Sequence, residues 1–316
     1  MSKRIAIITP GGDAPGVNAC IRVLVRKGIA QGFEMLGVYH GYQGLINGEI
    51  SRLHHNSVSG IIHRGGTILK STRSQEITTH TGLRRAVAGL RKHAIDYLVV
   101  IGGDGSFRAG LKIAQAGIPI IGIPASIDND VFGTDETIGF DTAINTAVEA
   151  IDKIRDTATS FDRIFLVEVM GREHGFLAQA VGLASGADFT ILPEKPYNLR
   201  RICAELIKDK AGTKTSEIIV VAEGTGSIMD MARKIEVQTK VPVRVSVLGY
   251  IQRGGTPSAR SRILASLFAN YAIDLIRHNI RNRVIVLRKC SVQNIPLERV
   301  VHGKKKLSDL TKNLSL

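Results

Sequence analysis

The stretch Ile118-Pro119-Ile120-Ile121-Gly122-Ile123, followed by Pro124-Ala125-Ser126-Ile127-Asp128-Asn129-Asp130, decides the fold class of this chain. Its first half is a short apolar run typical of a buried parallel strand. Its second half places Asp128 and Asp130 on a loop at the carboxyl end of that strand, where open α/β sheets bind ligands. One carboxylate could act as a base on a hydroxyl while the other helps to hold a metal. Asp-Asn-Asp is also ordinary turn chemistry, so this stretch alone leaves a plain turn open.

Apolar runs that indicate strands alternate with helical patterns along the whole chain. The expected strands are residues 4–9, 33–39, 97–101, 118–123, 163–169, 189–192, 218–222, 244–248 and 284–287. The expected helices are residues 17–30, 57–63, 83–92, 107–116, 140–157, 175–185, 199–210, 228–239 and 260–280. This alternation predicts parallel sheets with helices on both faces. Because the chain has 316 residues and 44% hydrophobic content, we expect two lobes.

Composition restricts the classes of function. The formal net charge is +14, and residues 251–316 hold 13 Lys and Arg against 3 Asp and Glu. A basic surface attracts nucleic acid, anionic membranes or small phosphate-bearing molecules. The chain contains no run of eighteen apolar residues, so we expect no membrane span. The N-terminal apolar stretch is too short for a signal peptide. Three scattered cysteines without metal-ligand spacing favour a reducing cytoplasm.

Two glycine-rich turns follow expected strands and precede expected helices. Gly11-Gly12-Asp13-Ala14-Pro15-Gly16 offers backbone N–H groups and a helix N-terminus to a phosphate. It matches neither the Walker A pattern nor Gly-x-Gly-x-x-Gly, so by itself it is weak evidence for phosphate binding. Gly102-Gly103-Asp104-Gly105-Ser106 has a carboxylate at its apex, where a hard cation that bridges phosphate oxygens could bind.

Arginines occur near the ends of several expected strands. Each one alone is most simply a surface ion pair. Together with two glycine-rich turns they indicate a pocket for more than one phosphate, because guanidinium groups bind phosphate oxygens in pairs. The arginines are Arg73, Arg163, Arg172, Arg244 and Arg253, and Glu223 lies at a similar position.

Five motifs together resemble one family, the bacterial ATP-dependent 6-phosphofructokinases, in order and spacing over essentially the whole chain. They are the two glycine-rich turns, Ile127-Asp128-Asn129-Asp130, Val169-Met170-Gly171-Arg172 and Gln252-Arg253-Gly254-Gly255. The resemblance implies a cytoplasmic homotetramer that phosphorylates the C1 hydroxyl of fructose 6-phosphate with Mg²⁺-ATP. It implies two similar three-layer α/β/α lobes with mainly parallel sheets and an active site in the cleft between them. Residues 1–139 plus 252–302 would bind ATP, and residues 140–251 plus 303–316 would bind the sugar phosphate.

The resemblance also implies a role for each matching residue. Asp128 would be the base, with Ser126, Asp130 and Arg172 also catalytic, and Asp104 would hold Mg²⁺ with Asp130 close to it. The implied ATP-binding residues are Gly11, Tyr42, Arg73, Ser74, Gly103, Asp104, Gly105 and Ser106. The implied sugar-binding residues are Ser126, Asp128, Arg163, Met170, Gly171, Arg172, Glu223, Arg244, Tyr250 and Arg253, of which Arg163 and Arg244 would reach a neighbouring subunit.

Several positions bear on the donor and on substrate affinity. Relatives that use pyrophosphate tend to carry an acidic residue at the position of Gly105 and a lysine at that of Ala125, so these small residues favour ATP. Pro10 replaces a common Ser and removes an N–H donor. Tyr250 replaces a common His and carries no positive charge, which predicts weaker sugar binding. Ser74 replaces an aromatic residue, so stacking near the adenine would be lost.

The expected effector site for ADP or phosphoenolpyruvate departs from the family pattern. Its matching residues are Arg22, Arg26, Arg155, Asp188 and Lys214. His55, Gly60 and Gly212 replace an Arg, an Asp and a Lys. The loss of two cations predicts blunted regulation by these anions.

Two other functions remain open at this point. Another kinase with a Gly-Gly-Asp-Gly turn, of the NAD or lipid kinase type, would lack Ile-Asp-Asn-Asp and Gln-Arg-Gly-Gly together. A catalytically dead, basic nucleic-acid-binding relative would need aromatic side chains among its basic residues. The chain is only 5% aromatic and has no Trp, which argues against nucleic acid as a partner.

Overall fold

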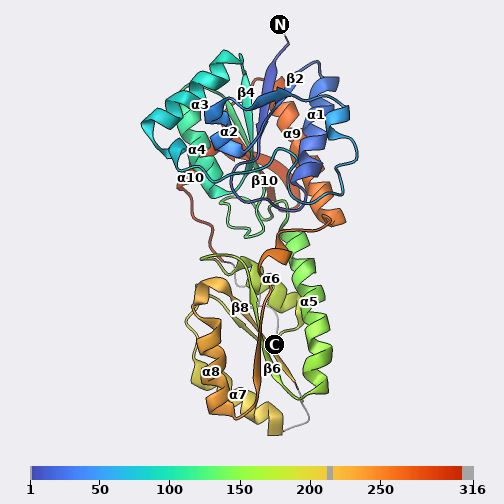
Figure 1. Ribbon diagram of the computed structural model, residues 1–316, viewed down its shortest axis with the longest axis vertical. Helices are drawn as coiled ribbons and strands as arrows, with labels where there is room; N and C mark the ends of the chain where they lie inside the picture. The colour runs from blue at the N-terminus through green and yellow to red at the C-terminus, as the bar shows by residue number, and fades with distance from the viewer. Residues whose placement is uncertain (1, 212–215, 308–316) are drawn as a thin grey trace. The chain divides into compact units, whose positions relative to one another are not determined.

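The computed structural model describes residues 2–211 and 216–307 (Figure 1). The chain divides into two compact units. Unit 1 comprises Met1–Thr142 and Arg253–Lys305, and unit 2 comprises Ala143–Gln252 and Lys306–Leu316. The chain therefore passes between the units three times. Within the described ranges, no helix has both the length and the apolar character needed to cross a membrane.

Unit 1 is built on one seven-stranded sheet in the order β11-β10-β5-β4-β1-β2-β3. The five inner strands are parallel, whereas β3 and β11 pair antiparallel at the two edges. All six residues of β4 are buried, as a central parallel strand covered on both faces requires. The strands are β1 (Arg4–Ile8), β2 (Glu34–Val38), β3 (Ile50–Arg52), β4 (Tyr97–Gly102), β5 (Ile120–Pro124), β10 (Arg283–Arg288) and β11 (Ser291–Pro296).

Helices cover both faces of this sheet (Figure 1). On one face α1 (Val17–Ala30) packs along α9 (Ala259–Arg277), although more than two hundred residues separate them in the chain. The other face carries α2 (Gly41–Asn47), α3 (His80–Lys92), α4 (Asp104–Gln115) and α10 (Leu297–His302). The core beneath these helices includes Leu45, Leu90 and Phe107. Short 3₁₀ turns occur at η1 (Asn56–Val58) and η2 (Glu76–Thr78).

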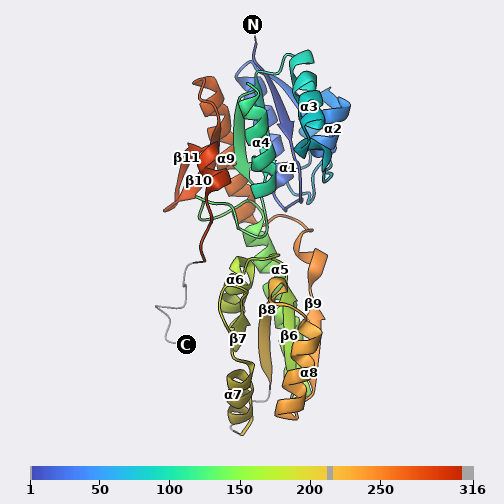
Figure 2. The same cartoon turned by 90° about the vertical axis from the view of Figure 1, so that its left-hand side faces the viewer.

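Unit 2 is built on a four-stranded parallel sheet in the order β7-β8-β6-β9. Its strands are β6 (Ile164–Val169), β7 (Phe189–Ile191), β8 (Glu217–Ala222) and β9 (Val243–Val247). Helices α7 (Leu199–Ala211) and α8 (Ile228–Thr239) share a core with one face of the sheet. Helices α5 (Phe140–Ser160) and α6 (Phe176–Ser185) lie on the other side (Figure 1), and Figure 2 views the unit from the side of α8. Short 3₁₀ turns η3 (Glu223–Thr225) and η4 (Gly249–Gln252) follow β8 and β9.

The expected α/β class with mainly parallel sheets is confirmed, and the differences have local causes. Residues 57–63 are not a helix, since only the 3₁₀ turn η1 forms nearby. Helix α2 lies outside the expected helices, because the glycines of Gly41-Tyr42-Gln43-Gly44 are typical of a turn. A Cβ on Gly44 would lie 1.7 Å from the carbonyl oxygen of Tyr39. The elements β3, β11 and α10 were not expected. Both strands are edge strands with largely exposed side chains, so their apolar signal is weak.

Candidate active site

The two glycine-rich turns of unit 1 lie next to each other because β1 and β4 are adjacent parallel strands. The Ser106 Oγ donates a hydrogen bond to the carbonyl oxygen of Pro10, with a distance of 2.9 Å. A Cβ on Gly102 would lie 2.5 Å from the same Oγ, so only glycine fits there. The Ser71 Oγ donates to the carbonyl oxygen of Gly11 at 2.6 Å. The first loop is therefore held from two sides by hydroxyl groups.

Helix α4 begins at Asp104, three residues earlier than the sequence pattern predicted. The turn Gly103–Ser106 is therefore the first turn of the helix, where backbone N–H groups and the helix dipole favour a phosphate. A Cβ on Gly105 would meet no atom within 4 Å, which leaves open space beside this turn. The Asp104 carboxylate pairs with the Arg108 guanidinium at 2.8 Å.

Asp104 is the residue of this turn that could hold a metal. Within the described ranges, no group of three or more His, Cys, Asp or Glu side chains comes together as a complete metal site. Mg²⁺ commonly takes only one or two protein carboxylates and completes its coordination with water and substrate phosphates. The half-buried Asp104 carboxylate beside an open phosphate-binding turn fits that mode.

Tyr42 and Ser74, both expected at the ATP site, have hydrogen-bond partners within the protein. The Tyr42 side chain is buried, and its hydroxyl donates to the carbonyl oxygen of Ser106 at 2.7 Å. Burial raises the pKa of Tyr42, so the hydroxyl stays protonated and supports the turn from behind. The Ser74 Oγ donates to the Gln43 Oε1 at 2.8 Å. Arg73, next to Ser74, is exposed.

The loop after β5 carries the expected base. The Ser126 Oγ accepts a hydrogen bond from the N–H of Asp128 at 3.1 Å and lies 3.4 Å from the Asp130 Oδ1. Asn129, between the two carboxylates, has φ of 52°, a left-handed conformation that Asn tolerates better than most residues. Asp128 is 7% exposed, whereas Asp130 is half-buried.

The Asp128 loop and the Asp104 turn lie together at the carboxyl edge of the sheet. A Cβ on Gly103 would lie 3.8 Å from the Ser126 Cβ, which is an ordinary contact. The N–H of Ala125 also donates to the carbonyl oxygen of Gly102 at 3.0 Å. The structure thus brings the N-terminus of α4, which is suited to a phosphate, and a pair of loop carboxylates to one place.

Arg253, expected to bind the sugar phosphate, pairs with the first glycine-rich loop. Its Nη2 lies 2.5 Å from the Asp13 Oδ1. A Cβ on Gly12 would lie 3.0 Å from the same Nη2, so the guanidinium packs closely against the loop backbone. Sequence reasoning missed this role for Asp13, because 240 residues separate the two partners.

In unit 2 the expected sugar-binding residues follow neighbouring strands. The carboxylate of Glu223, directly after β8, accepts a hydrogen bond from the N–H of Arg172, which follows β6. Gly171 has φ of 142°, and a Cβ there would lie 2.5 Å from the carbonyl oxygen of His174. The buried Gln252 accepts a hydrogen bond from the N–H of Met170 at 2.9 Å.

The Glu223 charge also affects its neighbour Glu168. Burial and, after it, repulsion from Glu223 raise the pKa of the Glu168 carboxyl above its ordinary value. Two carboxylates at the ends of adjacent strands create a negative region that a sugar hydroxyl or the Arg172 guanidinium can offset.

The remaining expected sugar-binding side chains lie at the surface of unit 2. The Arg163 guanidinium stacks 4.6 Å from the centre of the Phe161 ring. The Arg244 Nη1 donates to the carbonyl oxygen of Val243 at 3.2 Å, and Tyr250 is 78% exposed. The expected reach of Arg163 and Arg244 into a second subunit stays a prediction.

The expected effector residues are distributed over both units. Arg22 and Arg26 lie on α1 and are half-buried. The Arg155 Nη2 donates to the carbonyl oxygen of Ser185 at 2.7 Å, and the Asp188 Oδ2 accepts from the N–H of Ile218 at 2.6 Å. Lys214, and the departure at Gly212, lie outside the described residues. Among the described residues, those assigned from unit 2 are bound to main-chain groups of their own unit.

Comparisons with known proteins identify relatives of this chain. The family model described as Phosphofructokinase matches residues 4–276. An ATP-dependent 6-phosphofructokinase of Bacillus subtilis is 45% identical over 318 residues, covering 99% of this chain and 100% of the relative. The enzyme of the same name from Bacillus pumilus is 51% identical over 274 residues, covering 87% of this chain and 86% of the relative.

Solved structures show the same fold. The Pichia pastoris phosphofructokinase superposes with a TM-score of 0.90 at 33% identity, over 95% of this chain and 35% of that longer chain. A pyrophosphate-dependent phosphofructokinase of Marinobacter aquaeolei superposes with a TM-score of 0.86 over 97% of this chain and 86% of that chain. At 21% identity this second likeness shows the fold alone. The family model, the relatives and the shared fold lead to one conclusion: the chain belongs to the phosphofructokinase family.

Proposed function

We propose that this chain is an ATP-dependent 6-phosphofructokinase, which transfers the terminal phosphoryl group of ATP to the C1 hydroxyl of fructose 6-phosphate. The products are fructose 1,6-bisphosphate and ADP. The observation that carries the proposal is the contact between the Asp128 loop and the first turn of α4 at one edge of the unit 1 sheet. Relatives with that printed name and 45–51% identity support the same substrates.

The proposed mechanism needs positioning and charge neutralisation more than covalent chemistry. Asp128 accepts the proton of the attacking hydroxyl, and Ser126 and Asp130 orient the loop that carries it. Arg172 neutralises charge on the transferred phosphoryl group. Asp104 would hold Mg²⁺, which when bound supplies positive charge to the phosphate oxygens. In this proposal unit 1 binds ATP through the two glycine-rich turns, and unit 2 binds the sugar phosphate.

The choice of ATP over pyrophosphate rests on space beside α4. A side chain at Gly105 would enter an open region next to the first turn, and Ala125 is small and buried. An acidic side chain at Gly105 would repel a triphosphate and occupy the space that a nucleotide needs. These two small residues therefore support a nucleotide donor.

The assembly and regulation are proposed on the family's pattern. The half-buried Arg163 and the exposed Arg244 and Tyr250 are suited to a sugar site completed by a second subunit of a cytoplasmic homotetramer. Binding of ADP or phosphoenolpyruvate as effectors would be weak, since His55 and Gly212 stand where relatives have an Arg and a Lys.

The test is a coupled assay on the purified chain. Fructose 6-phosphate and ATP with Mg²⁺ are supplied, and fructose 1,6-bisphosphate is detected by its cleavage with aldolase. We expect turnover with ATP, little with pyrophosphate, and loss of activity in excess chelator. Turnover with pyrophosphate only would show that pyrophosphate, and not ATP, is the phosphoryl donor. No fructose 1,6-bisphosphate with either donor would refute the proposal. Parallel runs with phosphoenolpyruvate and ADP measure the regulation.

A further inference from the structure

The segment after α10 lies against the loop that follows the expected base. Gly303 is the first residue of this segment, and a Cβ there would lie 2.3 Å from ring carbons of Phe132. Its φ of −79° is ordinary, so the absence of a side chain, and not the backbone conformation, is what the site requires. Glycine thus lets the chain pass close to the ring and brings Lys305 to the loop.

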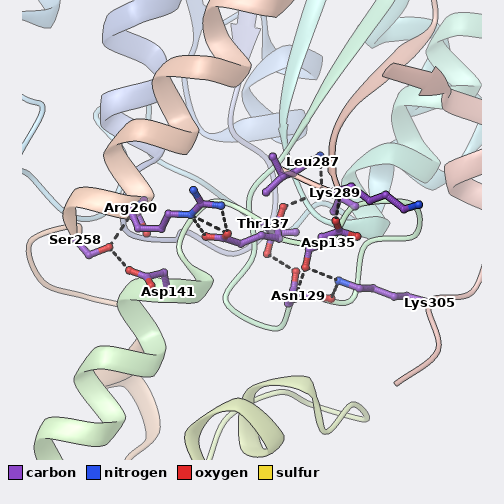
Figure 3. Close-up of polar contacts among 12 residues, drawn as sticks. Asn129, Asp135, Thr137, Asp141, Ser258, Arg260, Leu287, Lys289 and Lys305 are labelled. Atoms are coloured by element: carbon purple, nitrogen blue, oxygen red, sulfur yellow. Dashed lines mark hydrogen bonds and ion pairs between the residues drawn. The ribbon is translucent and has the colours of Figure 1, made fainter. Parts of the chain in front are cut away.

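The Lys305 amine holds the loop at the residue between the two carboxylates (Figure 3). Its Nζ donates to the carbonyl oxygen of Asn129 at 2.6 Å and lies 3.5 Å from that of Asp135. The Asn129 Nδ2 donates to the same Asp135 carbonyl oxygen at 3.0 Å. Lys305 and the Asn129 side chain therefore converge on one acceptor and close a compact ring of contacts.

The far side of this ring is fixed to the sheet. The N–H of Asp135 donates to the carbonyl oxygen of Leu287 on β10, and the Asp135 Oδ2 accepts from the N–H of Lys289, both at 2.8 Å. One residue further on, Glu136 pairs with Arg260 of α9 at 2.7 Å. Because the Asp135 end is anchored, the contact with Lys305 transfers that rigidity to Asn129.

Asn129 is the position where such support matters. Its φ of 52° places the backbone in a sparsely populated region that the surroundings must stabilise. The carbonyl oxygen that Lys305 holds belongs to the peptide that joins Asn129 to Asp130. Rotation of that peptide would change the directions of the Asp128 and Asp130 side chains on either side of it.

We propose that Lys305 is a positioning residue for phosphoryl transfer, which orients Asp128 and Asp130 by fixing the Asn129 carbonyl group. This inference rests on the proposed function of Asp128 as the base. Lys305 touches the loop backbone, so its effect on the reaction is carried by the loop.

The hydrogen bond, and not the positive charge, is the expected basis of the effect. Burial lowers the pKa of Lys305 to about 8, and the negative charges of Asp130, Asp135 and Glu136 oppose that shift. A neutral amine still donates hydrogen bonds. The anchor therefore holds in both protonation states of Lys305.

The test compares Lys305→Met with Lys304→Met. Both changes remove one amine from the same segment, but Lys304 is exposed whereas Lys305 is partly buried against the loop. We expect Lys305→Met to lower kcat by about 10- to 100-fold, the size of effect that slight misplacement of a reacting group produces. The KM values for ATP and fructose 6-phosphate should stay within about twofold, since in this proposal Lys305 acts through the loop backbone and not on either substrate. Lys304→Met should behave as the parent.

A chemical rescue separates positioning from folding, and it also serves if Lys305→Met does not fold. Lys305→Cys is made in a Cys290→Ser background, because Cys290 is exposed while Cys20 and Cys203 are buried. Alkylation of the folded protein with 2-bromoethylamine then installs an amine of nearly lysine length at position 305. We expect kcat to recover at least tenfold on alkylation, while the Cys290→Ser parent is unaffected.

The outcomes separate the two proposals. No fructose 1,6-bisphosphate from the parent protein would refute the proposed function itself. An active parent with unchanged kcat in Lys305→Met, even with a lower melting temperature, would overturn only the role of Lys305. Equal losses in Lys304→Met, or no recovery on alkylation, would overturn it as well.

Discussion

The loop edge of unit 1 and that of unit 2 are built differently. In unit 1 the glycine-rich turns are held by hydroxyl groups, by the Asp13–Arg253 pair and by the buried Tyr42. In unit 2 the backbone of residues 170–172 is held by Glu223 and Gln252, whereas Tyr250 is 78% exposed. One edge presents a fixed backbone and carboxylates, and the other presents exposed side chains on a fixed backbone.

This difference suggests a division of work. A rigid edge can align reacting groups before substrate arrives, so its mutations should lower kcat. Exposed long side chains lose freedom when they bind, so their mutations should change KM. Of the four expectations below, those at Asp128 and Tyr250 test this difference directly. The one at Gly105 tests access of the nucleotide to unit 1, and the one at Glu168 tests stability in unit 2.

The largest expected effect is at Asp128. Asp128→Asn keeps the shape of the side chain but removes the base, and loss of general-base catalysis typically costs about 10²–10⁴ in rate. The kcat for fructose 6-phosphate with ATP should fall by that factor with little change in KM. Asp152→Asn, an exposed position on α5, is the control. A kcat within threefold of the parent would remove Asp128 from the mechanism.

The next effect is at Gly105. Because a Cβ there meets nothing within 4 Å, Gly105→Asp should fold normally and place a carboxylate beside the first turn of α4. Repulsion between like charges should raise the KM for ATP by roughly tenfold or more. Gln115→Glu adds the same charge at the far end of α4 and should leave KM unchanged. An unchanged KM in Gly105→Asp would show that the nucleotide does not approach this turn.

A smaller effect is expected at Tyr250. Tyr250→His can place a positive charge near a sugar phosphate, and hydrogen bonds to charged groups are about twice as strong as neutral ones. The KM for fructose 6-phosphate should fall by about threefold at pH 6, less at pH 8 where the imidazole is neutral, with kcat unchanged. Tyr250→Phe is the matched variant without the hydroxyl. A pH-independent KM in Tyr250→His would place the phosphate elsewhere.

The smallest effect concerns Glu168. Because the pKa of the Glu168 carboxyl is raised, the folded state binds its proton more tightly than the unfolded state does. The contribution of this group to stability therefore falls as the pH rises above the ordinary pKa of a glutamate carboxyl. Glu168→Gln should raise the melting temperature by about 1–3 °C at pH 8 and by less at pH 4.5. Glu173→Gln, at an exposed nearby position, is the control. Equal shifts at both pH values would contradict the electrostatic explanation.

The sequence predicted the parts of the fold whose signals are local. The strand at residues 4–9 and the helix at residues 17–30 were expected because apolar side chains recur at the right period. The loops with Asp104 and Asp128 were expected because they follow such strands. The short helix at Gly41–Asn47 was not expected, since its glycines normally indicate a turn.

The contacts that hold the site were less predictable. Arg253 pairs with Asp13 across 240 residues, and Lys305 binds Asn129 across 176 residues. The sequence around each of these residues does not indicate which residue is its partner. The contact of Tyr42 with the nucleotide stays a prediction, and the bond of its buried hydroxyl to the Ser106 carbonyl oxygen was not foreseen. Residue type and spacing therefore indicated the chemistry, while the supporting contacts depend on how the whole chain is folded.

The order of strands in unit 1 has a consequence for synthesis on the ribosome. The strand β5 pairs on one side with β4 and on the other with β10, which is translated only after all the helices and strands of unit 2. Until then β5 is an open edge, and α9 is not yet available to cover α1. Nascent chains of this protein thus expose a strand edge and an apolar helix face for most of elongation, when aggregation is most easily initiated.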